Sequence, residues 1–182
     1  MDSWKELIKL VIISLVIVVP FRLYIAQPFI VDGASMDPTF HTGNYLIVDE
    51  ITYRFKTPER GSVLIFKYPK DPRKSFIKRV IGLPGEKVSI NNGEVIITNS
   101  QFPDGFKLNE PYIKLPKSET ASYKLSQDEY FVMGDNRLAS ADSRLWGPVP
   151  KGNIVGRPIF QLFPPDIWPG ENLNYSYLRV LN

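Results

Sequence analysis

One segment near the N-terminus divides this chain into two parts with different folding requirements. Residues 10–21 carry no charged side chain, and extending the segment to residues 7–26 gives 20 residues. A helix of that length measures about 30 Å, the thickness of a bilayer core. It can span the core if the side chains of Lys9 and Arg22, near its two ends, extend toward the interfaces. The sequence therefore predicts one transmembrane anchor within residues 1–26 and a globular domain over residues 27–182.

The charges beside this segment predict its orientation. Lys5 and Lys9 precede it, and the positive-inside tendency keeps such an end in the cytoplasm. The alternative is a cleavable signal peptide, whose cleavage site needs small residues at the last and third-last positions. Here Ala26 would be last, but Tyr24 would be third-last. We therefore expect an uncleaved anchor with a cytoplasmic N-terminus and an extracytoplasmic domain.

The remainder of the chain has the pattern of short β-strands separated by turns. Its 16 prolines and 12 glycines fit a loop-rich, mainly antiparallel all-β domain. Runs rich in Val, Ile, Phe and Tyr cover residues 27–32, 44–49, 62–68, 76–81, 87–90, 94–98, 129–133 and 154–160. Asn92-Gly93 between two of these runs predicts a hairpin turn. Residues 100–127 lack a clear period, so we predict an insertion there rather than a second core.

Composition narrows the chemistry that this chain can perform. It has no cysteine, which excludes disulfides, a thiolate nucleophile and a Cys-ligated zinc site. The net charge of +3 and the pI near 9.0 are only mildly basic, and Lys and Arg are scattered rather than clustered with aromatic residues. We therefore expect no nucleic-acid partner, whereas attraction to anionic lipid is a natural use of this charge. We also expect no metal and no cofactor.

Ser35 is a candidate nucleophile. It lies in the segment GASMDPT at residues 33–39, where glycine and small neighbours allow a substrate backbone to approach closely. The same pattern is typical of a plain turn at the end of a strand, in which a serine only forms hydrogen bonds. Local sequence leaves both interpretations open. A catalytic serine would also need a base within hydrogen-bond reach.

The chain offers few bases for such a serine. Its one histidine, His41, is six residues from Ser35, and we expect it to lie in a polar loop away from catalysis. A lysine acts as a base only when neutral, so its pKa must fall by several units, which burial achieves. Lys78 shares one face of a predicted strand with Phe76 and Val80, which makes its surroundings apolar. The alternative is an edge-strand lysine that prevents aggregation.

Three segments in order resemble bacterial type I signal peptidase. They are GASMDPT at 33–39, KRVIGLPGE at 78–86 and GDNRLASADSRLWG at 134–147, and the apolar anchor precedes them as it does in that family. The resemblance implies a signal-peptidase-like β-fold in which Ser35 is the nucleophile and Lys78 the general base of a Ser-Lys dyad. Relatives in the endoplasmic reticulum carry histidine at the lysine position, so this chain is similar to the bacterial and organellar branch.

The resemblance also implies supporting roles around the dyad. One serine is expected to hydrogen-bond the lysine amine, and two acid–arginine pairs are expected to support it. These residues are Ser140, Asp135 with Arg79, and Asp142 with Arg144. The backbone N–H of Ser35 is an expected oxyanion donor. Gly33 occupies the position where some members supply a Ser or Thr hydroxyl, so the second donor stays open.

The strand before Ser35 suggests how a substrate would bind. A precursor could add as a further strand beside residues 29–32, with alternate side chains entering pockets. Apolar, bulky pocket residues would leave room only for small side chains, such as Ala, at the last and third-last positions before the cut. The residues we predict for these pockets are Phe29, Val31, Met36 and Ile77, and the alternative for all four is simple core.

The sequence thus predicts a membrane-bound serine endopeptidase that removes N-terminal signal peptides from secreted precursors through an acyl-enzyme. Its expected partners are signal-peptide-bearing precursors and the lipid bilayer. Its expected location is the bacterial plasma membrane, or a thylakoid or other organellar membrane, with the catalytic domain on the outer face. One alternative is a catalytically inactive, membrane-tethered binding domain. Another is a self-cleaving repressor-type peptidase, which shares the dyad but lacks the anchor and the Gly-Asp-Asn-Arg block.

Overall fold

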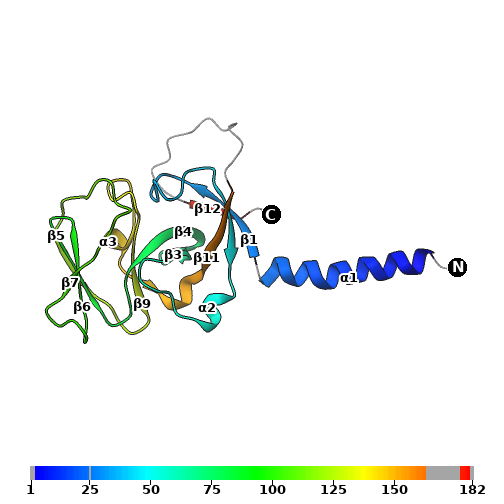
Figure 1. Cartoon of the computed structure of the whole chain (residues 1–182), viewed down its shortest axis with the longest axis horizontal. Helices are drawn as coiled ribbons and strands as arrows, with labels where there is room; N and C mark the ends of the chain where they lie inside the picture. Colours follow the sequence, from blue (N-terminus) through cyan, green and yellow to red (C-terminus); the bar gives the residue numbers. More distant parts are fainter. Residues whose placement is uncertain (1–2, 25, 163–176, 181–182) are drawn as a thin grey trace.

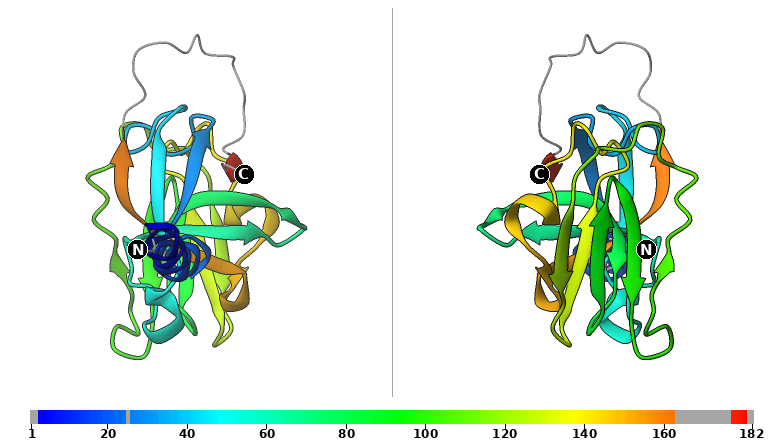
Figure 2. Two further views of the ribbon diagram at one scale, coloured as in Figure 1. Left: turned by 90° about the vertical axis from the view of Figure 1, so that its right-hand side faces the viewer. Right: turned by 90° about the vertical axis from the view of Figure 1, so that its left-hand side faces the viewer.

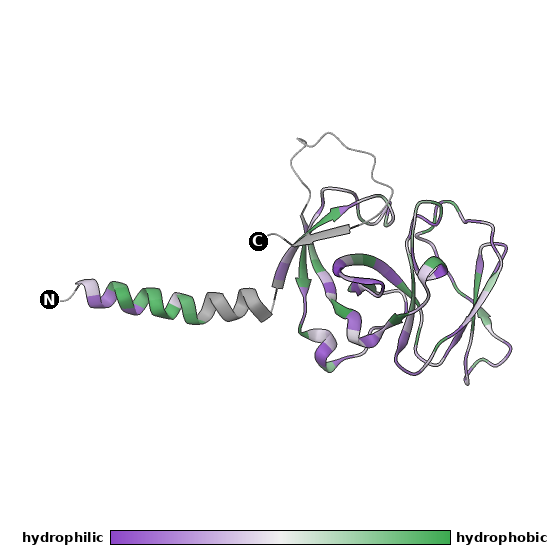
Figure 3. Ribbon diagram, turned by 180° about the vertical axis from the view of Figure 1, so that it is seen from behind, coloured by the Kyte–Doolittle hydropathy of each residue, from purple (hydrophilic) through white to green (hydrophobic). Residues whose placement is uncertain are grey.

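The N-terminal helix stands apart from the rest of the molecule. The computed structural model describes residues 3–24, 26–162 and 177–180. Helix α1 (Ser3–Tyr24) extends away from a β-rich domain (Figure 1), and much of the coloured part of its ribbon is hydrophobic (Figure 3). Within the described ranges, no helix combines the length and the hydropathy needed to cross a membrane.

Eight antiparallel strands form the main sheet. Their order is β10-β9-β4-β12-β1-β2-β11-β3, and β3 also pairs with β4, so the strands from β4 to β3 close into a ring. The bounds are β1 (Ala26–Asp32), β2 (Tyr45–Asp49), β3 (Val63–Tyr68), β4 (Asp71–Gly82), β9 (Glu129–Met133), β10 (Val149–Pro150), β11 (Ile154–Leu162) and β12 (Tyr177–Val180). Short helices α2 (Thr52–Phe55), α3 (Ser143–Trp146) and η1 (Lys151–Asn153) connect them.

A second, four-stranded sheet lies at the end of the molecule remote from α1 (Figures 1 and 2). Its order is β7-β6-β5-β8, with bounds β5 (Lys87–Asn91), β6 (Glu94–Thr98), β7 (Phe106–Lys107) and β8 (Ala121–Lys124). The predicted hairpin joins β5 to β6, and both Asn92 and Gly93 have positive φ, as a tight hairpin turn requires. The segment predicted as an insertion supplies β7 and β8.

This second sheet has its own buried core. Phe131 and Met133 of β9 and Ile81 of β4 pack against apolar side chains of β5 and β6, and Leu125 after β8 joins them. The segment over residues 100–127 therefore contributes to a second core, which its sequence did not indicate. Strand β7 has two residues, too few for a period of two, and β8, whose four residues alternate between half-buried and exposed, is at the shortest length at which alternation indicates a strand.

The predicted fold class is confirmed in its β part. All eight predicted runs correspond to strands of the structure, and every strand pair is antiparallel. Alternation explains β2, in which Leu46 and Val48 are buried while their neighbours are not. Strand β4 has a different pattern, because residues 76–78 are all buried. This strand is covered on both faces, and it is the strand that carries Lys78.

Candidate active site

Ser35 and Lys78 meet inside the domain. Strand β1 ends at Asp32, Gly33 turns the chain with φ of 100°, and Ser35 follows. Lys78 lies within β4, and its Nζ is 2.5 Å from Ser35 Oγ. Each residue is 1% exposed. The two candidates from separate sequence motifs are therefore in direct hydrogen-bond contact.

The surroundings of Lys78 disfavour its charged form. Burial lowers the pKa of Lys78 from 10.5 to about 8, against the charges of Asp142 and Asp135, which raise it. The charge of Arg144 assists the lowering. A substantial neutral fraction therefore exists near pH 8, as a general base requires.

Lys78 is not on a sheet edge. It pairs with Leu64 of β3, and Arg79 beside it pairs with Met133 of β9. The aggregation-blocking interpretation of this lysine is therefore wrong, because β4 has a neighbouring strand on each side.

The turn that carries Ser35 is held by residues that we did not single out from the sequence. Asn136 donates from its backbone N to the Ser35 carbonyl at 3.0 Å and from Nδ2 to the Ala34 carbonyl at 3.1 Å. Gly33 N donates to Thr42 Oγ1 at 3.0 Å. Asn136 belongs to the Gly-Asp-Asn-Arg motif, so the sequence did mark this residue as a candidate. Its role in holding the backbone of the Ser35 turn could not be predicted, because no sequence spacing is typical of such a role.

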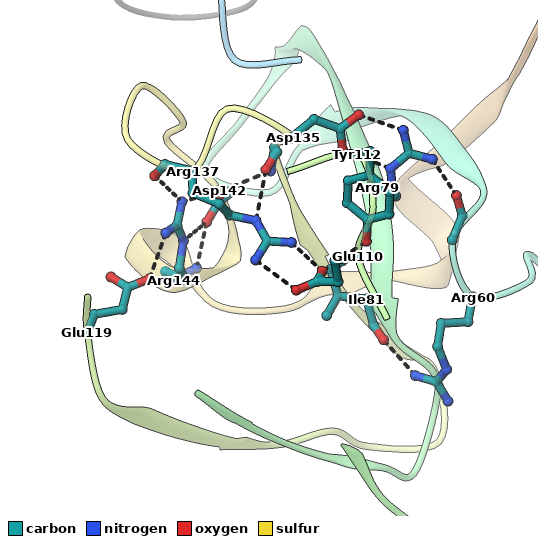
Figure 4. A network of polar contacts seen from close by, with 12 residues as sticks. Arg60, Arg79, Ile81, Glu110, Tyr112, Glu119, Asp135, Arg137, Asp142 and Arg144 are labelled. Carbon is teal, nitrogen blue, oxygen red and sulfur yellow. Dashed lines mark hydrogen bonds and ion pairs between the residues drawn. The ribbon is translucent and has the colours of Figure 1, made fainter. Parts of the chain in front are cut away.

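Asp135 and Arg79 form the first of the two expected acid–arginine pairs (Figure 4). Arg79 Nε donates to Asp135 Oδ1 at 2.8 Å and Nη2 donates to Oδ2 at 2.5 Å, while Nη1 reaches the Gly61 carbonyl at 2.7 Å. Thr39 Oγ1 donates to the same carboxylate at 2.5 Å. Burial opposes the charge of Arg79, but Asp135 outweighs it and raises the pKa of the guanidinium. This pair ties β4 to the turn after Ser35.

Asp142 and Arg144 form the second pair, and Asp142 is fully buried. Arg144 donates to both of its oxygens, at 2.7 and 2.8 Å, and Gly134 N donates at 3.0 Å. Burial alone would raise the pKa of Asp142, but the hydrogen bonds and charge of Arg144 keep it below its ordinary value. Asp142 therefore stays ionised next to the dyad.

Ser140 lies beside the dyad with its hydroxyl buried. Ser140 Oγ makes no hydrogen bond of ordinary geometry among the described residues, although it is near enough to Asp142 to help lower the pKa of that carboxyl. Gly134 fits between Ser140 and Ser35, because a Cβ at that position would overlap Ser140 Oγ and the Ser35 carbonyl oxygen. The expected contact from Ser140 to the Lys78 amine is not among the hydrogen bonds of this structure, so it stays a prediction.

The four predicted pocket residues share one cluster. Phe29, Val31, Met36 and Ile77 are at most 2% exposed and pack together in the core beside the dyad. Strand β1 is paired on both sides, with β2 and with β12. A precursor strand therefore meets an occupied edge along residues 29–32.

Other polar features lie away from Ser35. His41 is exposed and contacts Asp37 at 2.5 Å. Two surface cavities of about 250 and 430 Å³ are lined by residues of α2, β3 and β11, and of β6 and β7, respectively. Over the described ranges, no cluster of His, Cys, Asp and Glu side chains is suited to a metal ion.

Comparison with known proteins shows close relatives. Residues 4–163 match the family described as signal peptidase, peptidase S26. A probable signal peptidase I-1 of Synechocystis sp. is 37% identical over 172 residues, covering 90% of this chain and 85% of that protein. Signal peptidase I V of Bacillus subtilis (strain 168) is 36% identical over 160 residues, covering 80% and 90%. A solved signal peptidase I structure from Enterococcus faecalis V583 is 28% identical with a TM-score of 0.48, covering 56% and 97%.

Proposed function

Because this chain belongs to the signal peptidase family, peptidase S26, and is a serine endopeptidase of the signal peptidase I type, we propose that it acts through a dyad of Ser35 and Lys78. One observation carries the proposal: the 2.5 Å contact between Lys78 Nζ and Ser35 Oγ, in a site where both residues are buried. A buried amine in contact with a hydroxyl is the arrangement that activates serine when no histidine is present.

Acylation uses both members of the dyad. As Ser35 Oγ attacks the carbonyl carbon of the scissile peptide, its proton passes to the neutral amine of Lys78. The backbone N–H of Ser35 is the proposed donor to the oxyanion that forms on the carbonyl oxygen. The Lys78 ammonium then protonates the leaving nitrogen as the C–N bond breaks. The mature protein leaves with a new N-terminus, and the signal peptide stays on Ser35 as an ester.

Deacylation repeats the proton transfers with water. A water molecule gives a proton to Lys78 and attacks the ester carbonyl. The Lys78 ammonium then returns a proton to Ser35 Oγ as the C–O bond breaks. The signal peptide then leaves with a free carboxyl end. These steps need no metal or cofactor. Ser140 is the proposed hydrogen-bond partner that orients the Lys78 amine, and its buried hydroxyl close to Ser35 supports that role.

We further propose that α1 anchors the enzyme in a membrane with the domain on the outer face, and that small side chains precede the cut. The uncharged run over residues 10–21 and the exposed apolar side chains of the helix, from Leu7 to Val16, support the anchor. The cluster that includes Met36 and Ile77 supports selection of small residues, because these two buried, bulky, apolar side chains directly follow Ser35 and precede Lys78, respectively, in the chain.

Precursor cleavage tests this proposal. A precursor with Ala at the last and third-last positions before the cut is incubated in detergent with the full chain and with Ser35→Ala, Lys78→Ala and Lys67→Ala variants. Lys67 is an exposed lysine of β3 and serves as the matched control. We expect one cut after the second Ala, located by mass spectrometry, that is lost in the first two variants and kept in the control. Cleavage by folded Ser35→Ala protein would contradict the dyad.

A further inference from the structure

Two carboxylates outside the site motifs reach the loop that carries Ser140 and Asp142. Glu110 and Glu119 lie in the connection from β7 to β8 of the second sheet (Figure 4). Glu110 binds Arg137 with both oxygens, and the two side chains are 8% and 2% exposed. Glu119 accepts a 2.6 Å hydrogen bond from Arg144 Nη1.

The two arginines hold the loop from within. Arg137 Nε donates to the Gly134 carbonyl at 3.1 Å. Arg144 Nη2 donates to the carbonyls of Arg137 at 3.0 Å and Ser140 at 3.4 Å. A buried guanidinium that loses a carboxylate partner is destabilised and moves toward water if it can, and this effect is expected to be larger at Arg137 than at Arg144, which keeps Asp142. Such a movement would take these carbonyl contacts with it.

The same connection also reaches the other acid–arginine pair. The Tyr112 hydroxyl donates to Glu110 Oε1 at 2.9 Å, and the Tyr112 ring centre lies 4.1 Å from the guanidinium carbon of Arg79. Arg79 is the partner of Asp135. The connection therefore contacts the arginine network of the site at Arg137, Arg144 and Arg79.

We propose that Glu110 and Glu119 are positioning residues for the dyad, fixing the loop over residues 134–144 against Ser35 through Arg137 and Arg144. This inference rests on the proposed function of Ser35 and Lys78. It gives the second sheet a role in catalysis that neither its strands nor the site motifs indicate.

Charge-neutralising variants test this role in the full chain in detergent. Glu110→Gln, Glu119→Gln and the double variant are compared with Glu94→Gln, which removes an exposed carboxylate of the same sheet that pairs with Lys107. We expect kcat of the double variant to fall about 10-fold or more while KM changes less than about two-fold, because misplacement of the dyad affects the transition state rather than binding. Glu94→Gln should match the unchanged protein.

Two further readouts separate positioning from loss of fold and from failure of the proposed function. The kcat loss should persist at temperatures well below the unfolding midpoint of each variant. Hydrogen exchange should quicken in residues 134–144 of the double variant and stay unchanged in β2, a result that does not depend on activity. Unchanged exchange in 134–144, or a kcat equal to that of the unchanged protein, would overturn the inference. An inactive unchanged protein would instead count against the dyad.

Strand β12 separates two strands that lead to the dyad. This strand lies between β1 and β4, with Asp32 opposite Tyr177 and Leu178 opposite both Val31 and Ser75. Ser35 is three residues beyond the end of β1, and Lys78 is three residues beyond Ser75. Strand β12 therefore lies between the strand that leads to the candidate nucleophile and the strand that carries the candidate base.

We infer that β12 is an autoinhibitory strand, which must leave β1 before a precursor can pair there. A binding site that is open for only part of the time has an apparent affinity reduced by that fraction. Weakening β12 should therefore lower KM without changing the chemistry of the dyad. This inference also rests on the proposed function.

A proline in β12 tests this inference in the full chain. Leu178 pairs with β1 on one side and β4 on the other, so Leu178→Pro removes an N–H that points to one of them. Leu178→Ala keeps that N–H and is the control. We expect KM to fall about three-fold or more in Leu178→Pro alone. A synthetic peptide of residues 174–182 added in trans should raise it again.

The peptide also gives a result if Leu178→Pro fails to fold. Added to the unchanged protein, it should compete with the precursor for the edge of β1 and raise KM. An unchanged KM in folded Leu178→Pro, or a peptide without effect on either protein, would overturn the inference. Absence of any cleavage by the unchanged protein would contradict the dyad instead, and peptide binding would then be measured directly by fluorescence of a labelled peptide.

Discussion

At the scale of single residues, the amine of Lys78 is buried against a serine hydroxyl. Burial of its charged form lowers the stability of the folded state. The folded pKa is about 8 and the unfolded value 10.5. Below pH 8 both states bind the proton, and the folded state keeps the full penalty of a buried charge. Between those two values the unfolded chain binds a proton that the folded chain does not, so stability rises with pH.

A Lys78→Met variant should therefore be more stable than the unchanged protein at pH 7 although it is inactive. The gain expected from the pKa difference is about 3 kcal/mol, and it should shrink as pH rises from about 8 to about 10.5. Urea unfolding at several pH values measures it. The exposed control Lys67→Met should show no such gap, and a destabilised Lys78→Met at pH 7 would contradict the assigned burial penalty.

At the scale of elements, the loop from β9 to α3 joins the parts of the candidate active site. It contacts the Ser35 backbone through Asn136, carries Asp135 and Asp142, and receives carboxylates from the second sheet. Its first residue, Gly134, fits against both Ser35 and Ser140. The geometry of the dyad therefore depends on this loop as much as on β4.

Gly134→Ala should disable the enzyme through this close fit. The added Cβ overlaps the Ser35 carbonyl and Ser140 Oγ, so the loop must shift, and kcat should fall about 100-fold. Gly152→Ala is the matched control, because a Cβ there meets open space and no positive φ is involved. The measurement is kcat for precursor cleavage by each variant, with a thermal unfolding curve to show that each variant is folded. Equal kcat values for the two variants would show that the loop is not constrained by Gly134.

The same elements show how far the sequence could lead. Strands with several alternating or continuous apolar residues were predicted from the pattern. Ser35 and Lys78 were left open by local pattern and were singled out by the resemblance of three ordered motifs, and the structure places their side chains in contact. Strands β7 and β10 have two residues each, too few for a period, and the four residues of β8 and of β12 are at the shortest length at which alternation indicates a strand. The contacts of Glu110 and Glu119 with arginines about 25 residues away depend on how the second sheet docks, which local pattern does not encode.

At the scale of the whole molecule, the candidate active site lies between an apolar helix and a second sheet. Strand β1 is the next element after helix α1 in the chain, and β1 leads to Ser35 (Figure 1). A membrane anchor at that end would keep the dyad close to the surface where a precursor emerges. The connection from β7 to β8 of the second sheet supplies Glu110 and Glu119, which pair with Arg137 and Arg144 of the segment beside the dyad.

The proposed topology can be mapped because the chain has no cysteine. In intact bacterial cells, a membrane-impermeant maleimide should label Ser100→Cys, an exposed position that follows β6 of the second sheet. It should leave Ser3→Cys unlabelled until the cells are opened. Both proteins should sediment with membranes and cleave precursor. Labelling of Ser3→Cys in intact cells, or recovery of the protein in the soluble fraction, would contradict a single-pass anchor with a cytoplasmic N-terminus.

The most direct test of the central claim, that neutral Lys78 activates Ser35, is kcat/KM for precursor cleavage from about pH 6 to about pH 10, which follows the ionisation of the free enzyme. The predicted profile rises about ten-fold per pH unit, levels off above pH about 8, and is unchanged by His41→Ala. A flat profile, or a rise that His41→Ala removes, would contradict lysine as the base.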